Sequence, residues 1–292
     1  SRGLGDVYKR QTGSSEASLS ALRRAGSVKA TTMLIDTHCH LDFPDFEAER
    51  DDIIARAHAS GVSQMVTIST RVRRLPELLK ITEKYPSVFC SVGTHPNNAD
   101  EELDISADEL VQLAESHEKI VAIGEAGLDY FYDTQKPEDQ KTGLLRHIEA
   151  ARRTKLPLVI HSRSADDDMA AILRSESGKG AFPFILHCFS AGPELAKTGV
   201  ELGGYVSFSG ILTFPKSQDI RDIAATVPLD RLLVETDAPY LAPKRWRGKR
   251  NEPSYVVNTA EVLAEVHGIS FERMAEITTE NAFRCFSKMT RV

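Results

Sequence analysis

Short apolar runs alternate with longer amphipathic stretches from residue 33 to residue 292. The apolar runs are rich in β-branched residues, as expected of strands buried on both faces. They cover residues 33–38, 64–70, 88–93, 119–125, 156–161, 183–188, 204–209 and 231–237. The remaining stretches have apolar residues at helical spacing and cover residues 47–60, 75–84, 107–116, 137–154, 165–175, 193–202, 216–226, 256–267 and 271–286. This alternation predicts a parallel sheet covered by helices.

The number of strand–helix units favours a closed sheet over an open one. An open doubly wound sheet is the alternative, but eight regular units over roughly 260 residues are typical of a (β/α)₈ TIM barrel. No linker rich in proline, glycine or serine interrupts the pattern, and no shorter internal repeat is evident. We therefore predict an α/β protein with a single TIM-barrel domain at residues 33–292.

Residues 1–32 differ from the rest of the chain, because they are rich in serine, glycine and arginine and have no sustained period. An organellar transit peptide is one interpretation of such a composition. We favour a disordered or artefactual extension, since the opening SRGLGDVYKRQ resembles translated adapter sequence and Met33 directly precedes the first predicted strand.

Composition limits the classes of protein that this chain can be. The sequence is 41% hydrophobic and 27% charged, and no apolar run approaches the roughly 20 residues that a membrane-spanning helix needs. The four cysteines (Cys39, Cys90, Cys188 and Cys285) have no C-x-x-C spacing. We interpret them as free thiols and expect a cytoplasmic protein.

Charge is unevenly distributed. Residues 1–32 carry a net charge of +4, which leaves −10 for the remainder of a chain whose total is −6. Such an acidic body argues against a protein that coats nucleic acid through a broad basic face. It is compatible with an enzyme that handles phosphates at one local metal site.

Polar residues of one kind gather where the predicted strands end. His38 and His40 are two apart and therefore point to the same side of the first strand. His95 follows the third strand, Glu125 ends the fourth, His161 the fifth and His187 the sixth, and Glu235 and Asp237 end the eighth. The active sites of TIM barrels lie at these carboxyl ends. The other four histidines (His58, His117, His147 and His267) fall in helical patterns and are interpreted as structural.

The donor set exceeds what one tetrahedral catalytic ion uses, which is three protein ligands and a water. Six side chains are candidate ligands: His38, His40, Glu125, His161, His187 and Asp237. They suit two divalent ions bridged by a carboxylate, for which Glu125 is the candidate, and Asp237 is placed to hold or deprotonate a water. Zn²⁺ and Mn²⁺ tolerate this mixed set, whereas Mg²⁺ prefers oxygen. We expect Asp36 to orient an imidazole.

The loop after the eighth strand indicates the substrate. Residues 244–250 hold five cations around Trp246, the only tryptophan of the chain. A solvated loop is the alternative interpretation, but beside a metal site such a loop suits phosphate contacts and base stacking. Lys249 and Arg250 are candidate phosphate ligands, and Arg163 adds a cation just beyond His161.

Seven motifs in order resemble those of the TatD-like metal-dependent hydrolases, a deoxyribonuclease family of the amidohydrolase superfamily. They are Ile35–Leu41, Gly93–Pro96, Ile123–Tyr130, Val159–His161, Leu186–Ser190, Glu235–Tyr240 and Arg247–Pro253. The resemblance covers essentially all of residues 33–292. It implies a TIM barrel with a two-metal site and 3′–5′ exonuclease activity on single-stranded DNA.

The resemblance also implies roles for single residues. His38, His40, Glu125 and Asp237 would hold one ion, and Glu125, His161 and His187 the other. His95 would lie at the substrate phosphate, and Glu235 would support the metal-binding aspartate or the water. The implied reaction is attack by metal-activated water on a terminal phosphodiester, with Asp237 as the general base.

From these observations we predict a metal-dependent deoxyribonuclease that uses two divalent ions (Mg, Mn or Zn). We expect it to act on the 3′ end of single-stranded DNA as a monomer without a membrane partner. Two alternatives stay open: a hydrolase of an acyl or ester bond, such as a D-aminoacyl-tRNA deacylase, and a non-enzymatic metal-dependent DNA-binding module. The cationic loop favours a nucleic acid over a small neutral amide, but it does not separate DNA from a tRNA ester.

Overall fold

In the computed structural model, residues 33–132 and 135–292 are described. Residues 1–32, which we interpret as an extension, lie outside the described residues. Eight strands form one sheet in the order of the sequence, and each strand runs parallel to the next. They are β1 (Leu34–Cys39), β2 (Val62–Thr67), β3 (Val88–Val92), β4 (Ile120–Asp129), β5 (Leu158–Arg163), β6 (Phe184–Leu186), β7 (Tyr205–Phe208) and β8 (Leu232–Val234).

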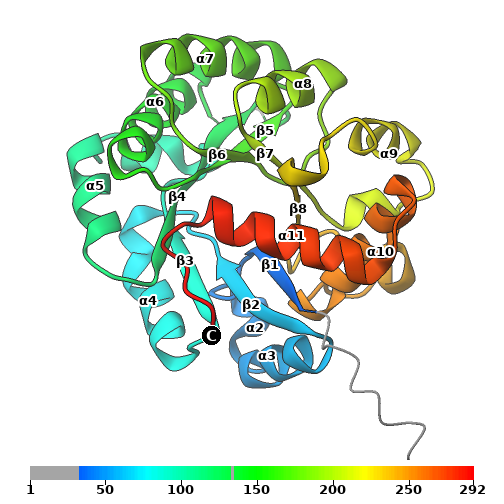
Figure 1. The fold of residues 1–292 in the computed structure, drawn as a ribbon. Coiled ribbons are helices and arrows are strands. Elements are labelled where there is room, and N and C mark those ends of the chain that lie inside the picture. Colours follow the sequence, from blue (N-terminus) through cyan, green and yellow to red (C-terminus); the bar gives the residue numbers. More distant parts are fainter. Residues whose placement is uncertain (1–32, 133–134) are drawn as a thin grey trace, which may run out of the picture. The chain divides into compact units, whose positions relative to one another are not determined.

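The sheet closes on itself between β1 and the chain that follows β8. Cys39 and Ala238 form a parallel bridge. Two backbone hydrogen bonds flank this bridge: the amide of Asp237 donates to the carbonyl of His38 at 2.9 Å, and the amide of His40 donates to the carbonyl of Ala238 at 2.8 Å. The predicted (β/α)₈ barrel is therefore confirmed (Figure 1).

Helices surround the barrel (Figure 1). They are α2 (Pro44–Glu47), α3 (Arg50–Ala59), α4 (Leu75–Lys84), α5 (Ala107–Glu115), α6 (Pro137–Thr154), α7 (Asp166–Lys179), α8 (Pro193–Glu201), α9 (Gln218–Ala224), α10 (Val256–His267) and α11 (Phe271–Cys285). Short 3₁₀ turns include η2 (Pro96–Glu102), η5 (Lys244–Trp246) and η6 (Pro253–Tyr255). Within the described residues, no helix has both the length and the apolar character required to cross a membrane.

The helix expected at residues 47–60 begins later, at Arg50, and a separate short helix, α2, precedes it. Pro44 begins α2, and Phe46 anchors it in the core. Glu49 then leaves the helical conformation, with φ −122° and ψ 10°, so that α3 starts at Arg50. The Arg50 side chain donates to the carbonyl of Leu41 at 2.7 Å, which fixes the new helix to the end of β1.

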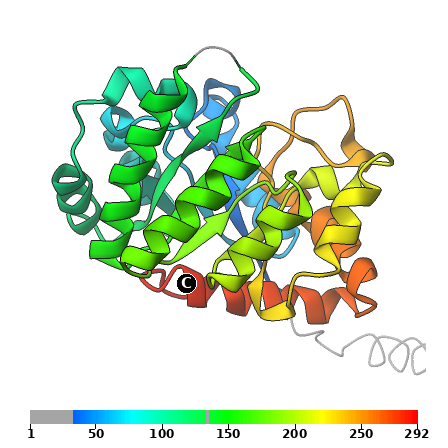
Figure 2. The ribbon, with the colours of Figure 1, turned by 90° about the horizontal axis from the view of Figure 1, so that it is seen from above.

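Two apolar layers hold the barrel together. The larger one lies between the strands and the surrounding helices. The other fills the barrel with residues such as Ile35, Val66, Phe89 and Leu233, and it includes Phe286 at the end of α11. The last helix, α11, therefore lies across one end of the barrel, as Figure 2 shows, and its apolar side chains seal that end.

Strand β4 is longer than the sequence pattern predicted, and it continues to Asp129. It pairs with β5 as far as Asp129 and Arg163. Gly127 permits this pairing, because a Cβ atom there would lie 1.9 Å from the carbonyl oxygen of His161. The extension carries Asp129 to the open end of the barrel, where it joins Glu125 beside His161.

Candidate active site

The six predicted metal ligands meet at the end of the barrel opposite α11. His38 lies on β1, Glu125 on β4 and His161 on β5. His40, His187 and Asp237 stand just beyond β1, β6 and β8. Because the strands are parallel, all these carboxyl ends reach the same rim.

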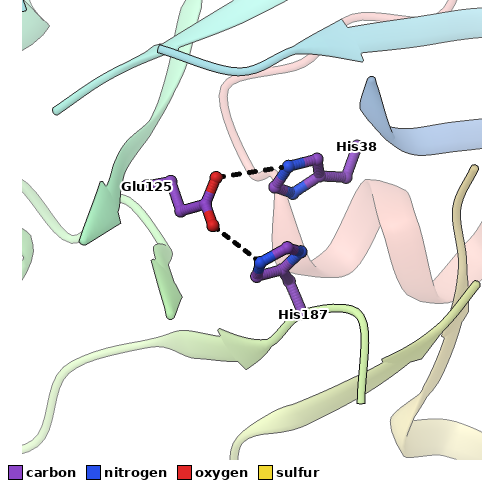
Figure 3. A group of neighbouring side chains, drawn as sticks. All are labelled: His38, Glu125 and His187. Carbon is purple, nitrogen blue, oxygen red and sulfur yellow. Dashed lines mark ion pairs between the residues drawn. The ribbon is translucent and has the colours of Figure 1, made fainter. Parts of the chain in front are cut away.

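Glu125 lies at the centre of the cluster, and only 2% of its surface is exposed. Its Oε1 lies 2.8 Å from Nε2 of His187 and 2.9 Å from Nδ1 of His161. Its Oε2 lies 3.4 Å from Nε2 of His38. Figure 3 shows the carboxylate between the rings of His38 and His187. Glu125 therefore contacts ligands from three strands, as expected of a bridging carboxylate.

A second group of candidate ligands consists of His38, His40 and Asp237. Nε2 of His38 is 3.3 Å from Nε2 of His40 and 3.6 Å from Oδ1 of Asp237. The same Asp237 oxygen is 3.4 Å from Nε2 of His40. Two sets of donors that could each hold a cation thus share His38: one is His38, Glu125 and His187, and the other is His38, His40 and Asp237.

The contacts of the histidine nitrogens that face away from the cluster indicate whether these side chains suit a metal ion. Nδ1 of His40 lies 3.2 Å from the carbonyl of Ile68, and Nδ1 of His187 lies 3.2 Å from Glu235. Nε2 of His161 lies 3.1 Å from Oδ2 of Asp129. Acceptors at the remote nitrogens direct the other nitrogen's lone pair into the cluster, and metal-binding histidines are generally held in this way. The donor set therefore fits a divalent cation.

Electrostatics lead to the same conclusion. Burial alone would raise the pKa of Glu125, yet His187 and His161 hold that pKa well below its ordinary value. Burial would lower the pKa of His187, yet Glu125 and Glu235 raise it well above the ordinary value. The carboxylates and imidazoles therefore influence one another strongly, and a bound cation would stabilise the same carboxylates.

Asp36 does not orient an imidazole, contrary to the expectation from sequence. Its Oδ1 accepts from the amide of Thr236 at 2.9 Å, and its Oδ2 lies 2.6 Å from the Thr236 hydroxyl. Burial raises the pKa of Asp36 to about 8, against the opposing effect of those hydrogen bonds. Thr236 can reach Asp36 because β1 lies beside the chain that follows β8, where the barrel closes. Asp36 therefore ties β1 to the turn that carries Asp237.

His95 faces Glu125 but differs from the metal-ligand candidates in its hydrogen bonding. Its Nδ1 accepts from the amide of Asn97 at 3.0 Å, and its Nε2 lies 3.5 Å from Oε1 of Glu125. Burial lowers the pKa of His95 to about 3, so the ring is neutral and carries its proton on Nε2. His95 is therefore a hydrogen-bond donor toward the centre of the site, although its position would also allow a metal contact with Glu125 and His161.

A cavity of about 610 Å³ opens above the ligands. Its lining includes the metal-ligand candidates His40, Glu125, His161, His187 and Asp237, together with His95. The cations Arg71 and Arg163 and the aromatic rings of Phe43, Tyr132 and Tyr240 form much of the remaining wall. This volume lies within the range of about 300–1,000 Å³ that is common for small-ligand sites.

The sequence model of the TatD related DNase family matches residues 35–287. This chain belongs to the TatD family. The uncharacterized metal-dependent hydrolase YabD of Bacillus subtilis is 39% identical over 256 residues, which cover 87% of this chain and 99% of YabD. YcfH of Escherichia coli K12, also named an uncharacterized metal-dependent hydrolase, is 40% identical over 256 residues, covering 87% of this chain and 95% of YcfH.

A solved structure agrees with these relatives. The crystal structure of YjjV, a TatD homologue from Escherichia coli K12, matches with a TM-score of 0.82 and 31% sequence identity. The match covers 88% of this chain and 99% of YjjV. The protein is thus a metal-dependent hydrolase of the TatD family, and the resemblance noted from its motifs is confirmed.

The remaining predicted site residues of this TatD-family chain lie in different surroundings. Arg163 lines the cavity, with its guanidinium 3.8 Å from the ring centroid of Phe131. Glu235 does not line the cavity, is fully buried and accepts from His187. Glu235 is therefore placed to support a ligand rather than to contact substrate.

The cationic loop after β8 is arranged differently from its prediction. Trp246 stacks on Tyr255, with ring centroids 4.6 Å apart and nearly parallel planes. Lys249 lies over the same indole at 5.2 Å, and Arg250 pairs with Glu49 at 3.0 Å. Trp246, Lys249 and Arg250 are absent from the cavity lining. The structure brings Arg163 and His95 to the metal-ligand candidates but does not bring these three there.

Two residues that were not predicted hold the site in place. Asp129 orients His161, and it could have been found from its spacing, because residues 125, 127 and 129 of one strand share a face. Asn251 is fully buried, and its Nδ2 donates to the carbonyls of Thr236 and Tyr240 at 2.8 and 2.6 Å. Asn251 thereby fixes the turn that carries Asp237, and no local sequence pattern indicates this role.

Proposed function

We propose that this TatD-family hydrolase is a deoxyribonuclease that uses two divalent ions to remove nucleotides from the 3′ end of single-stranded DNA. The observation that carries the proposal is the composition of the cavity wall. Candidate metal ligands lie beside the Nε2–H donor of His95, and the guanidinium groups of Arg163 and of Arg71, which also pairs with Glu101, lie in the same lining. Donors and cations around one cavity suit an anionic phosphodiester, and guanidinium groups match phosphate geometry.

His38, His40, Glu125 and Asp237 would hold one ion, and Glu125, His161 and His187 the other. Bound divalent ions lower the pKa of water and offset charge on phosphoryl oxygens. The protein's own groups would divide the remaining work. His95 donates a hydrogen bond to a phosphoryl oxygen, and Arg163 and Arg71 hold the strand.

Asp237 would accept the proton of the attacking water. Its side chain is 15% exposed, compared with 2% for Glu125, so it can reach a water in the cavity. The bond from phosphorus to the 3′ oxygen of the preceding nucleotide breaks, and this oxygen takes up a proton from water to become the new 3′ hydroxyl. The products are a 5′-mononucleotide and a strand that is one nucleotide shorter.

The test uses single-stranded DNA labelled at either end, with Mg²⁺, Mn²⁺ or Zn²⁺, and a D-aminoacyl-tRNA as the competing substrate. Stepwise release of label from the 3′ end is expected. Asp237→Asn should reduce turnover by about 10²–10⁴-fold, the usual contribution of a general base, with an unchanged circular dichroism spectrum. Asp219→Asn, on the exposed face of α9, is the matched control.

Two results would contradict the proposal. Deacylation of the tRNA without cleavage of DNA would assign the site to an ester. Wild-type turnover by the Asp237→Asn variant would show that Asp237 is not the general base.

A further inference from the structure

Two large aromatic side chains are exposed at the cavity that holds the metal-ligand candidates. Tyr132 is 47% exposed and Tyr240 is 55% exposed, and both line the cavity. Tyr132 follows β4, whereas Tyr240 follows β8. These strands are four positions apart in a closed barrel of eight. The two tyrosines therefore reach the cavity from strands on opposite sides of the barrel.

Tyr240 is fixed relative to the turn that carries Asp237. Its amide donates to the carbonyl of Asp237 at 2.9 Å, and its own carbonyl accepts from Asn251 at 2.6 Å. The edge of its ring packs against Phe43, with centroids 6.1 Å apart, and Phe43 stacks on His40 at 4.6 Å. The ring is thus exposed, but its backbone and its neighbours are held by the site.

Tyr132 is attached to the site through Asp129. Its amide lies 3.4 Å from Oδ1 of Asp129, whose other oxygen holds His161. Its ring packs edge-on against Phe131 at 5.0 Å, and the guanidinium of Arg163 lies 4.9 Å from its centroid. Each tyrosine is therefore linked, within one or two contacts, to a metal-ligand candidate.

Exposed aromatic rings in the wall of a cavity that suits phosphate offer faces on which the bases of a single strand can stack. Resting on the nuclease function proposed above, we propose that Tyr132 and Tyr240 are stacking platforms for the two bases that flank the scissile phosphate. A phosphodiester between two nucleotides has one base on either side, which matches two lining tyrosines that follow strands on opposite sides of the barrel.

This arrangement determines which chain ends are accepted. A base can stack on a tyrosine only after leaving its neighbours, so an unpaired end is favoured over a paired one. Every base has a π-face, so the platforms tolerate any sequence. A nucleotide that lacks its base loses the contact, although its phosphate and sugar are unchanged.

The experiment measures equilibrium binding to the metal-loaded protein by fluorescence anisotropy. The probes are short single strands with cleavage-resistant phosphorothioate linkages at the 3′ end. Three strands are compared: one complete, one abasic at the last nucleotide, and one abasic at the nucleotide before it. For the wild type, each abasic strand should bind about 5- to 150-fold more weakly than the complete strand, the range for one base stacked on an aromatic side chain.

The variants assign the effect to the rings. Tyr132→Leu and Tyr240→Leu keep apolar bulk but remove the ring, and each should abolish the discrimination at one of the two abasic positions. Tyr132→Phe and Tyr240→Phe keep the ring and should discriminate like the wild type. Both side chains are exposed, so the substitutions should leave the fold intact.

Equal binding of complete and abasic strands by the wild type would overturn the inference. Unchanged discrimination in both leucine variants would overturn it as well. Binding is read without cleavage, so the two proposals fail separately. Base-dependent binding without release of nucleotides would reject the nuclease but retain the platforms, and nucleotide release without base dependence would do the reverse.

Discussion

The two ends of the barrel are built from the same strands but have opposite chemistry. At the end closed by α11, the strands contribute Ile35, Val66 and Phe89 to an apolar interior. At the other end, their extensions present imidazoles and carboxylates. In β1 the change takes place between Ile35 and His38, three residues apart. Stability and chemistry thus occupy separate ends of one scaffold.

The polar end is buried almost as deeply as the apolar one, and this is what distinguishes it from an ordinary protein surface. His38, Glu125 and Glu235 are at most 2% exposed. Buried ionisable groups disfavour folding unless they are paired or bind a metal. The site therefore depends on stability that is supplied elsewhere, and the sealed end is the clearest source.

The largest effect on stability is expected from Phe286→Ala. Phe286 is fully buried in the apolar layer inside the barrel, and truncation of a buried phenylalanine costs about 3–5 kcal/mol. Urea unfolding of the metal-free protein should show this loss. Turnover per folded molecule should stay close to wild type, and a selective loss of turnover would show that the two ends are not separate.

Asp129→Asn should weaken metal binding rather than unfold the protein. The carboxylate of Asp129 holds His161, and loss of such a supporting group typically weakens metal binding about 10- to 100-fold. Calorimetric titration with Zn²⁺ measures this change, and the fold should persist because the asparagine oxygen can still accept from the amides of Phe131 and Tyr132. Asp168→Asn is the matched control, because Asp168 contacts Tyr130 and Lys141 and does not line the cavity. Equal affinities of the two variants would contradict the role of Asp129.

His147 tests whether every buried histidine near the polar end belongs to the chemistry. It lies on α6, and its Nε2 accepts from the amide of Thr94 at 3.1 Å, next to His95. Burial lowers the pKa of His147 from its ordinary value of 6.5 to about 4 in the folded protein. At a pH between these two values, His147 is protonated in the unfolded chain and neutral in the folded one. The stabilisation is fully present above about pH 6.5 and is lost as the pH falls toward 4.

Between pH 7 and pH 5 this linkage amounts to about 2 kcal/mol. His147→Asn, which does not titrate, should therefore lose less unfolding free energy than the wild type over that interval. Urea unfolding at several pH values gives the comparison. Parallel pH dependences of the two proteins would show that His147 is not the group responsible.

Much of the polar end could be predicted because its residues follow strands. His38 and His40 share a face through their spacing, and parallel strands bring Glu125, His161 and His187 to the same rim. The barrel itself follows from the alternation of apolar runs and amphipathic stretches, and α4, α6 and α10 begin and end where the pattern predicted.

Contacts between distant segments could not be predicted in this way. The loop of residues 244–250 reads as a cationic surface, but Arg250 contacts Asp45 and Glu49, about two hundred residues earlier. Asp36 reads as a partner for a neighbouring imidazole, but β1 lies beside the turn after β8, so Thr236 reaches it first. Such pairings arise from barrel closure, and no local period encodes them.

The helix that seals the barrel lies far along the chain from the first strand, and this separation affects the order of folding. The Thr279 hydroxyl of α11 donates to the carbonyl of Met33 at 2.8 Å, across a sequence separation of 246 residues. Contacts this distant in sequence form slowly, because a long loop must close before they contribute. During synthesis, the apolar lining of the barrel has no cover until α11 has emerged from the ribosome. A chain that has formed its strands but not docked α11 therefore exposes apolar surface, and such surface favours aggregation.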